Sequence, residues 1–199
     1  MAWTEDVALR VAKKIKTEDS PYTIGQLSHG IEIFLLNIIN TAALLISSLA
    51  FGVFWEVIPL VVLFFLHRLL TGGVHLSNPW SCLTATLVLM IGGGFLLKYM
   101  PILPMPYAQI LILIGIGASF CINYRYAPAE HTYVPTNPDI QKRNRFIVLI
   151  LIGIGCILSI VLVEYSYRLS ITYTLAVLLQ SALLLPRLFK LVSRFENLS

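Results

Sequence analysis

The stretch FIVLILIGIGCILSIVLV at residues 146–163 decides the fold, because it carries no charged side chain over its whole length. An α-helix of about 20 such residues crosses the roughly 30 Å hydrocarbon core of a membrane. The rest of the chain has the same character, with 57% hydrophobic and only 12% charged residues. A soluble domain of 199 residues needs a more charged surface than this. The sequence therefore predicts an integral membrane protein.

Further apolar runs predict an all-α, polytopic integral membrane helical bundle of about six transmembrane helices. The six runs lie near residues 31–52, 54–70, 82–97, 103–123, 146–163 and 169–189. Gly52 and the three prolines between Met100 and Pro106 mark two of the turns between them. We therefore expect a single six-span transmembrane domain at residues 31–199.

Basic residues predict the orientation of this bundle, because Lys and Arg near the ends of spans are retained in the cytoplasm. Of the 14 Lys and Arg residues, 12 fall on one side of the predicted spans, and only Lys98 and Arg168 fall on the other. We therefore expect a multi-pass protein of the plasma membrane with both termini in the cytoplasm.

We expect residues 1–30 to form a separate, basic N-terminal segment, whose first 20 residues are too polar to span a membrane. Arg10, Lys13, Lys14 and Lys16 alternate there with apolar residues. Such a mixture is typical of a helix that lies on the inner leaflet. It is equally compatible with a short segment whose charges only fix the orientation of the first span.

The loop between the second and third runs has the composition of a reactive site. It reads HRLLTGGVHLSNPWSC at residues 67–82 and combines two histidines, a glycine pair and a cysteine. A cysteine beside an imidazole base is a nucleophilic pair, and His75 and Cys82 are the candidates. Alternatively, His67, His75 and Cys82 could bind zinc, although no fourth ligand is evident. We predict no metal and no cofactor.

The proposed pair requires the chain to turn back on itself. On a straight helix His75 and Cys82 would lie about 10.5 Å apart along the axis, whereas proton transfer requires about 3 Å. Gly72 and Gly73 permit an unusual backbone turn. Asn78 can then cap a new helix that begins with Pro79. Cys82 would lie in the first turn of this helix, where the helix dipole favours a thiolate.

Together with its neighbouring blocks, this loop resembles the accessory gene regulator B (AgrB) family of membrane cysteine endopeptidases in quorum sensing. The resemblance rests on Gly-Gly-x-His, six residues and Cys at 72–82, and on YAPAE at 126–130 with the basic KRNR at 142–145. Gly30-Ile31-Glu32 is a weaker third block. The likeness covers nearly the whole chain and implies that Cys82 is the nucleophile and His75 its base.

The family resemblance also implies the substrate and the reaction. The substrate is a precursor peptide with an amphipathic leader and an acidic tail. Cys82 attacks the bond before the tail, and the signal portion remains as an enzyme thioester. An internal Cys or Ser then closes a thiolactone or lactone ring. The bilayer is a further partner, a homodimer is expected from the family alone, and no nucleic-acid partner is expected.

Other residues are candidates for supporting catalysis or for binding the peptide. Trp80 lies at the membrane edge, where it would help to keep water from a thioester. The basic loop would attract an acidic tail, although retention in the cytoplasm explains the same charges. Asn37 and Asn40 share a helix face near Glu32, which either lines the peptide site or packs helices together. The full set is Arg68, Gly72, Gly73, Asn78, Trp80, Glu32, Asn37, Asn40, Lys142, Arg143 and Arg145.

Two remaining interpretations concern other residues and another class of function. Cys121 and Cys156 lie inside apolar runs and are interpreted as packing residues. Glu164 and Arg168 are expected to pair along one helix, if that helix continues between them. The rival function is a small peptide exporter or scaffold whose His and Cys serve packing. The sequence has no nucleotide-binding loop and few intramembrane charges for ion coupling, which disfavours an exporter.

Overall fold

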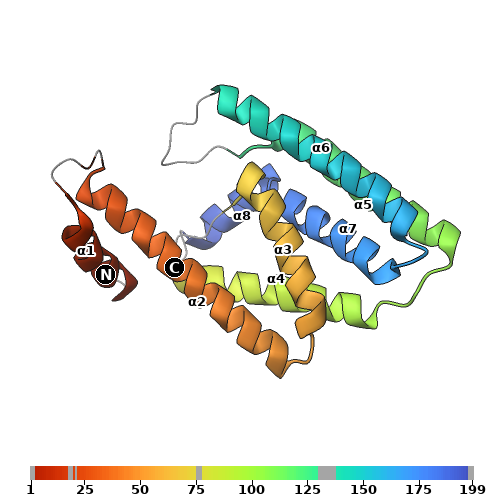
Figure 1. Cartoon of the computed structure of the whole chain (residues 1–199), viewed down its shortest axis with the longest axis horizontal. Helices are drawn as coiled ribbons and strands as arrows, with labels where there is room; N and C mark the ends of the chain where they lie inside the picture. The colour runs from red at the N-terminus through yellow and green to blue at the C-terminus, as the bar shows by residue number, and fades with distance from the viewer. Residues whose placement is uncertain (1–2, 18–19, 21, 75–77, 130–137, 197–199) are drawn as a thin grey trace. The chain divides into compact units, whose positions relative to one another are not determined.

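The computed structural model describes residues 3–17, 20, 22–74, 78–129 and 138–196, and every regular element in these ranges is an α-helix. The all-α prediction is therefore confirmed. The helices are α1 (Trp3–Ile15), α2 (Ile24–Ala50), α3 (Phe54–Thr71), α4 (Pro79–Tyr99), α5 (Met105–Tyr126), α6 (Pro138–Leu162), α7 (Tyr167–Ala182) and α8 (Pro186–Glu196) (Figure 1).

Five helices, α2 to α6, are long and apolar enough to cross a membrane. The sixth predicted span, residues 169–189, is not one continuous helix. The chain leaves the helix after Ala182, and Pro186 starts α8 at an angle of 63° to α7. Proline breaks helices because it lacks an N–H group and its ring clashes with the preceding turn. The chain is thus a multi-pass membrane protein with five spans, or six if the bent pair counts as one; the location of its termini stays a prediction.

The structure divides into two compact units, residues 1–50 and 51–199. In the first unit, α1 packs on α2 through Thr4, Ala8 and Ala12, which recur every fourth residue and are buried. Small residues at this spacing let two helices approach closely. The hydroxyl of Thr4 also donates to Glu32 Oε1 on α2, at 3.5 Å.

Helix α2 begins seven residues before the predicted start of the first span. Thr23 and Gln26 explain this difference. Gln26 N donates to Thr23 Oγ1 at 3.2 Å, and Thr23 N donates to Gln26 Oε1 at 2.9 Å. This reciprocal pair is a capping box, which satisfies N–H groups at the start of a helix.

In the second unit, α7 packs against α3, α5 and α6, and more narrowly against α4 (Figure 1). It is unusually polar for such a position, since Ser170, Thr172, Thr174, Gln180 and Ser181 are all buried. Polar side chains inside a membrane bundle are costly unless they are hydrogen-bonded to other helices. The hydroxyl of Ser181 accordingly accepts a hydrogen bond of 2.7 Å from Asn123 Nδ2 on α5.

The expected pair of Glu164 and Arg168 is wrong, because no helix joins them. Helix α6 ends at Leu162 and α7 begins at Tyr167, with a turn between. Arg168 Nη1 instead lies 3.5 Å from Glu56 Oε1, so that the start of α7 is tied to the start of α3.

Candidate active site

Helix α4 begins as predicted and carries Cys82 in its first turn. The side chain of Asn78 caps the helix, with Oδ1 accepting from Trp80 N at 3.0 Å, and Pro79 follows as a first helical residue. Cys82 N donates to Asn78 O at 3.0 Å. The thiol is half-buried and has a side-chain hydrogen bond with Thr86 one turn later. The predicted base, His75, lies outside the described residues, as do residues 76 and 77.

The chain turn predicted at the glycine pair is present. Gly72 and Gly73 have φ angles of 65° and 132°, which residues with a Cβ atom rarely adopt. Gly72 N donates to Arg68 O at 2.8 Å and closes the end of α3. A Cβ atom on Gly73 would lie 3.2 Å from Arg68 Nη1 and 3.4 Å from Leu183 O. The second glycine is therefore required both by its backbone angle and by its close neighbours.

Helix α7 holds this turn through Gln180, a residue that the sequence analysis missed. The Gln180 side chain is 1% exposed, and its Nε2 donates to Gly72 O at 2.9 Å and also to Thr71 Oγ1. One residue past the turn, Val74 N donates to Leu183 O at 3.1 Å. An amide inside the apolar run at 169–189 was the available signal, because such residues face protein and not lipid.

Arg68 connects the two ends of the loop. Its Nη2 donates to Val74 O, the carbonyl that directly precedes His75, at 2.8 Å. The same guanidinium interacts electrostatically with Cys82. Its Nη1 is buried and has no hydrogen-bond partner in the described part of the chain. Arg68 therefore bonds to the residue before His75 and also interacts with the thiol of Cys82.

The Tyr-Ala-Pro block reaches the same turn. Ala129 N donates to Thr71 O at 2.8 Å, directly before the glycine pair. Arg145 Nε on α6 donates to Ala127 O at 2.5 Å and anchors this block. Lys142 and Arg143 are exposed at the start of α6, as is Arg145. Two blocks that lie more than fifty residues apart in the sequence thus meet at Thr71. Within the basic cluster, Arg145 anchors the Tyr-Ala-Pro block, whereas Lys142 and Arg143 are surface charges.

His67 belongs to the packing of three helices. It is 4% exposed, its Nδ1 lies 2.9 Å from Leu63 O, and its Nε2 lies 3.4 Å from the hydroxyl of Tyr173. The Tyr173 hydroxyl donates to Leu151 O on α6 at 3.0 Å. Among the residues that the structure describes, no group of three or more His, Cys, Asp or Glu side chains could hold a metal ion. The alternative zinc site depends on His75, which lies outside them.

Four further candidate residues, Trp80, Glu32, Asn37 and Asn40, differ in their exposure and hydrogen bonding. Trp80 is 73% exposed at the start of α4, and its place at the membrane edge stays a prediction. Glu32 is bonded to Thr4, and so it joins α1 to α2. Asn37 is exposed and Asn40 is half-buried on α2. Whether these three residues of α2 line a peptide site stays a prediction.

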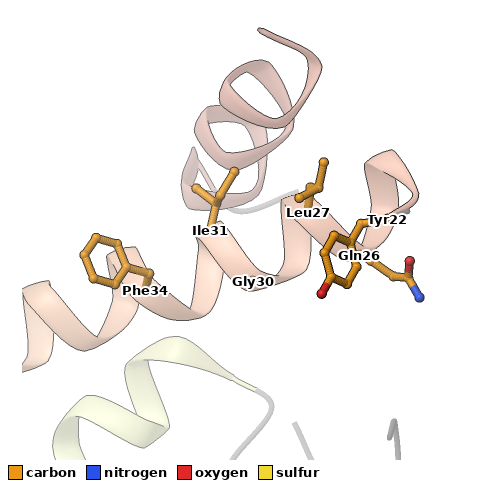
Figure 2. Close-up of a pocket in the computed structure, with 6 residues that line it drawn as sticks. All are labelled: Tyr22, Gln26, Leu27, Gly30, Ile31 and Phe34. Carbon is orange, nitrogen blue, oxygen red and sulfur yellow. The ribbon is translucent and has the colours of Figure 1, made fainter. Parts of the chain in front are cut away.

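The first unit also contains an open groove of about 350 Å³ beside the start of α2. Figure 2 shows Leu27 and Ile31 pointing to the same side of the helix. The lining residues are Tyr22, Gln26, Leu27, Gly30, Ile31 and Phe34. The surface of this groove is almost entirely apolar, and it offers no nucleophile or base.

Comparisons of the sequence with known proteins show a family and two relatives to which the chain is similar. A family profile described as accessory gene regulator B matches residues 5–184. An AgrB-like protein of Clostridium acetobutylicum is 28% identical over 126 residues, which cover 63% of this chain and 57% of that protein. An AgrB-like protein of Halalkalibacterium halodurans is 27% identical over 186 residues, which cover 92% of this chain and 87% of that protein. No solved structure matches the chain.

Proposed function

Because the chain belongs to the accessory gene regulator B family of quorum-sensing membrane proteins, we propose that it is a cysteine endopeptidase that processes a precursor peptide. It removes the C-terminal tail of the precursor and closes the remaining signal portion into a thiolactone or lactone ring. Cys82 is the nucleophile and His75 is the base. The reaction takes place at the cytoplasmic edge of the plasma membrane.

One observation carries this proposal: Arg68 touches the backbone that leads into His75 and also interacts with Cys82. Its positive charge favours the thiolate form of Cys82. The hydrogen bond to Val74 O fixes the backbone directly before the base. Arg68 thus interacts with the nucleophile and bonds to the residue that precedes the base, and an activated nucleophile needs such a base nearby.

The reaction then proceeds in two balanced steps. The Cys82 thiolate attacks the carbonyl carbon of the bond before the tail, the C–N bond breaks, and the leaving nitrogen takes a proton from the His75 imidazolium. The signal portion remains bound to Cys82 as a thioester. A thiol or hydroxyl within the peptide attacks this thioester, its proton passes to His75, and the Cys82 thiolate is released. Exclusion of water from the site favours ring closure over hydrolysis.

Surface charge supports recognition of the acidic tail. Lys142 and Arg143 are exposed beside the block that reaches Thr71. Two cations at a site entrance raise the local concentration of an acidic peptide segment. Arg145 is assigned a different role, because its side chain is bonded to Ala127 O.

The test is tail release by the full-length protein in proteoliposomes, with a synthetic precursor as substrate. Cys82→Ala is expected to abolish release while the protein still inserts and binds the precursor. Cys121→Ala and Cys156→Ala are matched controls that are expected to retain activity. Normal release by Cys82→Ala would overturn the assignment of the nucleophile.

A further inference from the structure

Helix α8 is an element of the described chain that the proposed function does not use. It spans Pro186–Glu196 and follows α7 after a bend of 63°. Its 11 residues extend about 16 Å, which is too short to cross a bilayer. It also lies beyond the family match, which ends at residue 184. The role of α8 must therefore be inferred from the side chains that it exposes.

That surface has two distinct faces. At 100° per residue, Leu188, Leu191 and Val192 share one side of the helix. Arg187, Lys190 and Arg194 share the adjoining side of the helix, and all three are exposed. This separation of apolar and basic side chains is the pattern of a helix that lies in a membrane interface.

The apolar face of α8 has no extensive cover among the residues that the structure describes. No described helix packs extensively against α8, and Leu191 is 48% exposed. Leu184, two residues before the helix, is 2% exposed, so the chain enters α8 from a buried residue. In a multi-pass membrane protein the bilayer surface is adjacent to the end of every span. Its anionic headgroups complement three cations, and its acyl region complements the apolar face.

We propose that α8 lies in the plane of the membrane and binds anionic phospholipid headgroups through Arg187, Lys190 and Arg194. This inference rests on membrane insertion and is independent of the peptidase chemistry. It has a consequence for the site, because Leu183 O, three residues before α8, accepts the hydrogen bond from Val74 N. Anchoring α8 at the membrane surface would therefore also fix the depth of Val74 in the membrane, directly before His75 in the sequence.

The experiment places a fluorescent label on the apolar face of α8 in the full-length protein. The chain carries Cys82→Ala, Cys121→Ala, Cys156→Ala and Val192→Cys, and the label is nitrobenzoxadiazole. The protein is reconstituted in phosphatidylcholine vesicles, with or without phosphatidylglycerol. Quenching by aqueous iodide and by lipids with a doxyl group on the acyl chain reports the surroundings of the label.

We expect iodide quenching to be roughly fivefold weaker, or more, with phosphatidylglycerol. Each Lys or Arg near an anionic surface strengthens membrane binding by a factor of about five. Doxyl quenching should rise in parallel. Changing Arg187, Lys190 and Arg194 together to Gln should remove the difference between the two membranes. Arg187→Lys with Arg194→Lys keeps the charges and should preserve it. A label at Ser193→Cys, on the polar side, should stay accessible to iodide in every case.

Two results would overturn the proposal. Equal iodide quenching in the two membranes would show that anionic lipid is not the ligand. Protection from both iodide and doxyl lipid would show that protein, such as a second copy of this chain, covers the apolar face.

Discussion

Gln180 Nε2 donates a hydrogen bond of 2.9 Å to the carbonyl oxygen of Gly72 across 108 residues of sequence. The glycine turn before His75 is thus held by a buried amide of α7, and the proposed active site is not a free-standing loop. Because the amide lies inside the bundle, water is a poor substitute for it. The position of the turn is therefore coupled to the packing of α7.

The first prediction concerns this contact. Gln180→Leu leaves Gly72 O and Thr71 Oγ1 without their donor, and a lost buried partner costs about 1–3 kcal/mol. Since 1.4 kcal/mol is tenfold in rate, we expect kcat for tail release to fall roughly tenfold or more, with KM changed less. Gln109→Leu on α5 is the matched control. A native kcat for Gln180→Leu would show that the contact does not position the site.

The second prediction concerns the backbone at Gly73, where φ is 132°. Gly73→Ala introduces a Cβ atom 3.2 Å from Arg68 Nη1 in a backbone region that alanine disfavours. We expect tail release to be lost and the thermal midpoint in detergent to fall by a few degrees. Gly117→Ala is the control, because a Cβ atom there meets nothing within 4 Å. In that helical position alanine should be neutral or stabilising by about 1 kcal/mol. Full activity of Gly73→Ala would contradict the required turn.

The third prediction separates the charge of Arg68 from its hydrogen bond to Val74. Arg68→Gln removes the cation that interacts with Cys82. Arg68→Lys keeps a positive charge but loses the planar guanidinium group and its several hydrogen-bond donors. We expect iodoacetamide to alkylate Cys82 roughly tenfold more slowly in Arg68→Gln, with a smaller effect in Arg68→Lys. Alkylation of Cys121 in the same molecules is the internal reference. Unchanged Cys82 reactivity in Arg68→Gln would show that the charge of Arg68 does not favour the Cys82 thiolate.

The fourth prediction divides the basic cluster by function. Lys142→Gln with Arg143→Gln should raise KM for an acidic precursor roughly tenfold at low salt, and the effect should shrink as salt screens the charges. Arg145→Gln should instead lower kcat at every salt concentration, because it loses the anchor to Ala127 O. Identical, salt-dependent behaviour of the two variants would show that Arg145 only contributes charge.

The sequence predicted the features that depend on local patterns. The apolar runs located the spans, and the glycine pair and Asn78-Pro79 located the turn and the restart of the helix. These features need only backbone preferences of adjacent residues. The early start of α2 has a local signal too, the capping box of Thr23 and Gln26, which sequence reasoning did not use.

Contacts between distant segments could not be predicted in this way. Gln180 with Gly72, Ala129 with Thr71, and Arg168 with Glu56 each join different elements. Which residues meet depends on how the helices pack against one another. The periodicity of a single sequence does not predict that packing. The bend before Pro186 was missed for another reason: hydropathy counts Leu183, Leu184 and Leu185 as part of a span, although they form a turn.

The most direct test of the central claim, that Cys82 becomes acylated with the help of His75, is the intact mass of the protein after reaction. The substrate is a precursor whose internal nucleophile is replaced by alanine, so that the ring cannot close. We expect an adduct on Cys82 with the mass of the precursor minus its tail, sensitive to hydroxylamine and absent from His75→Ala. Release of the tail without such an adduct, or with the adduct on another residue, would contradict it.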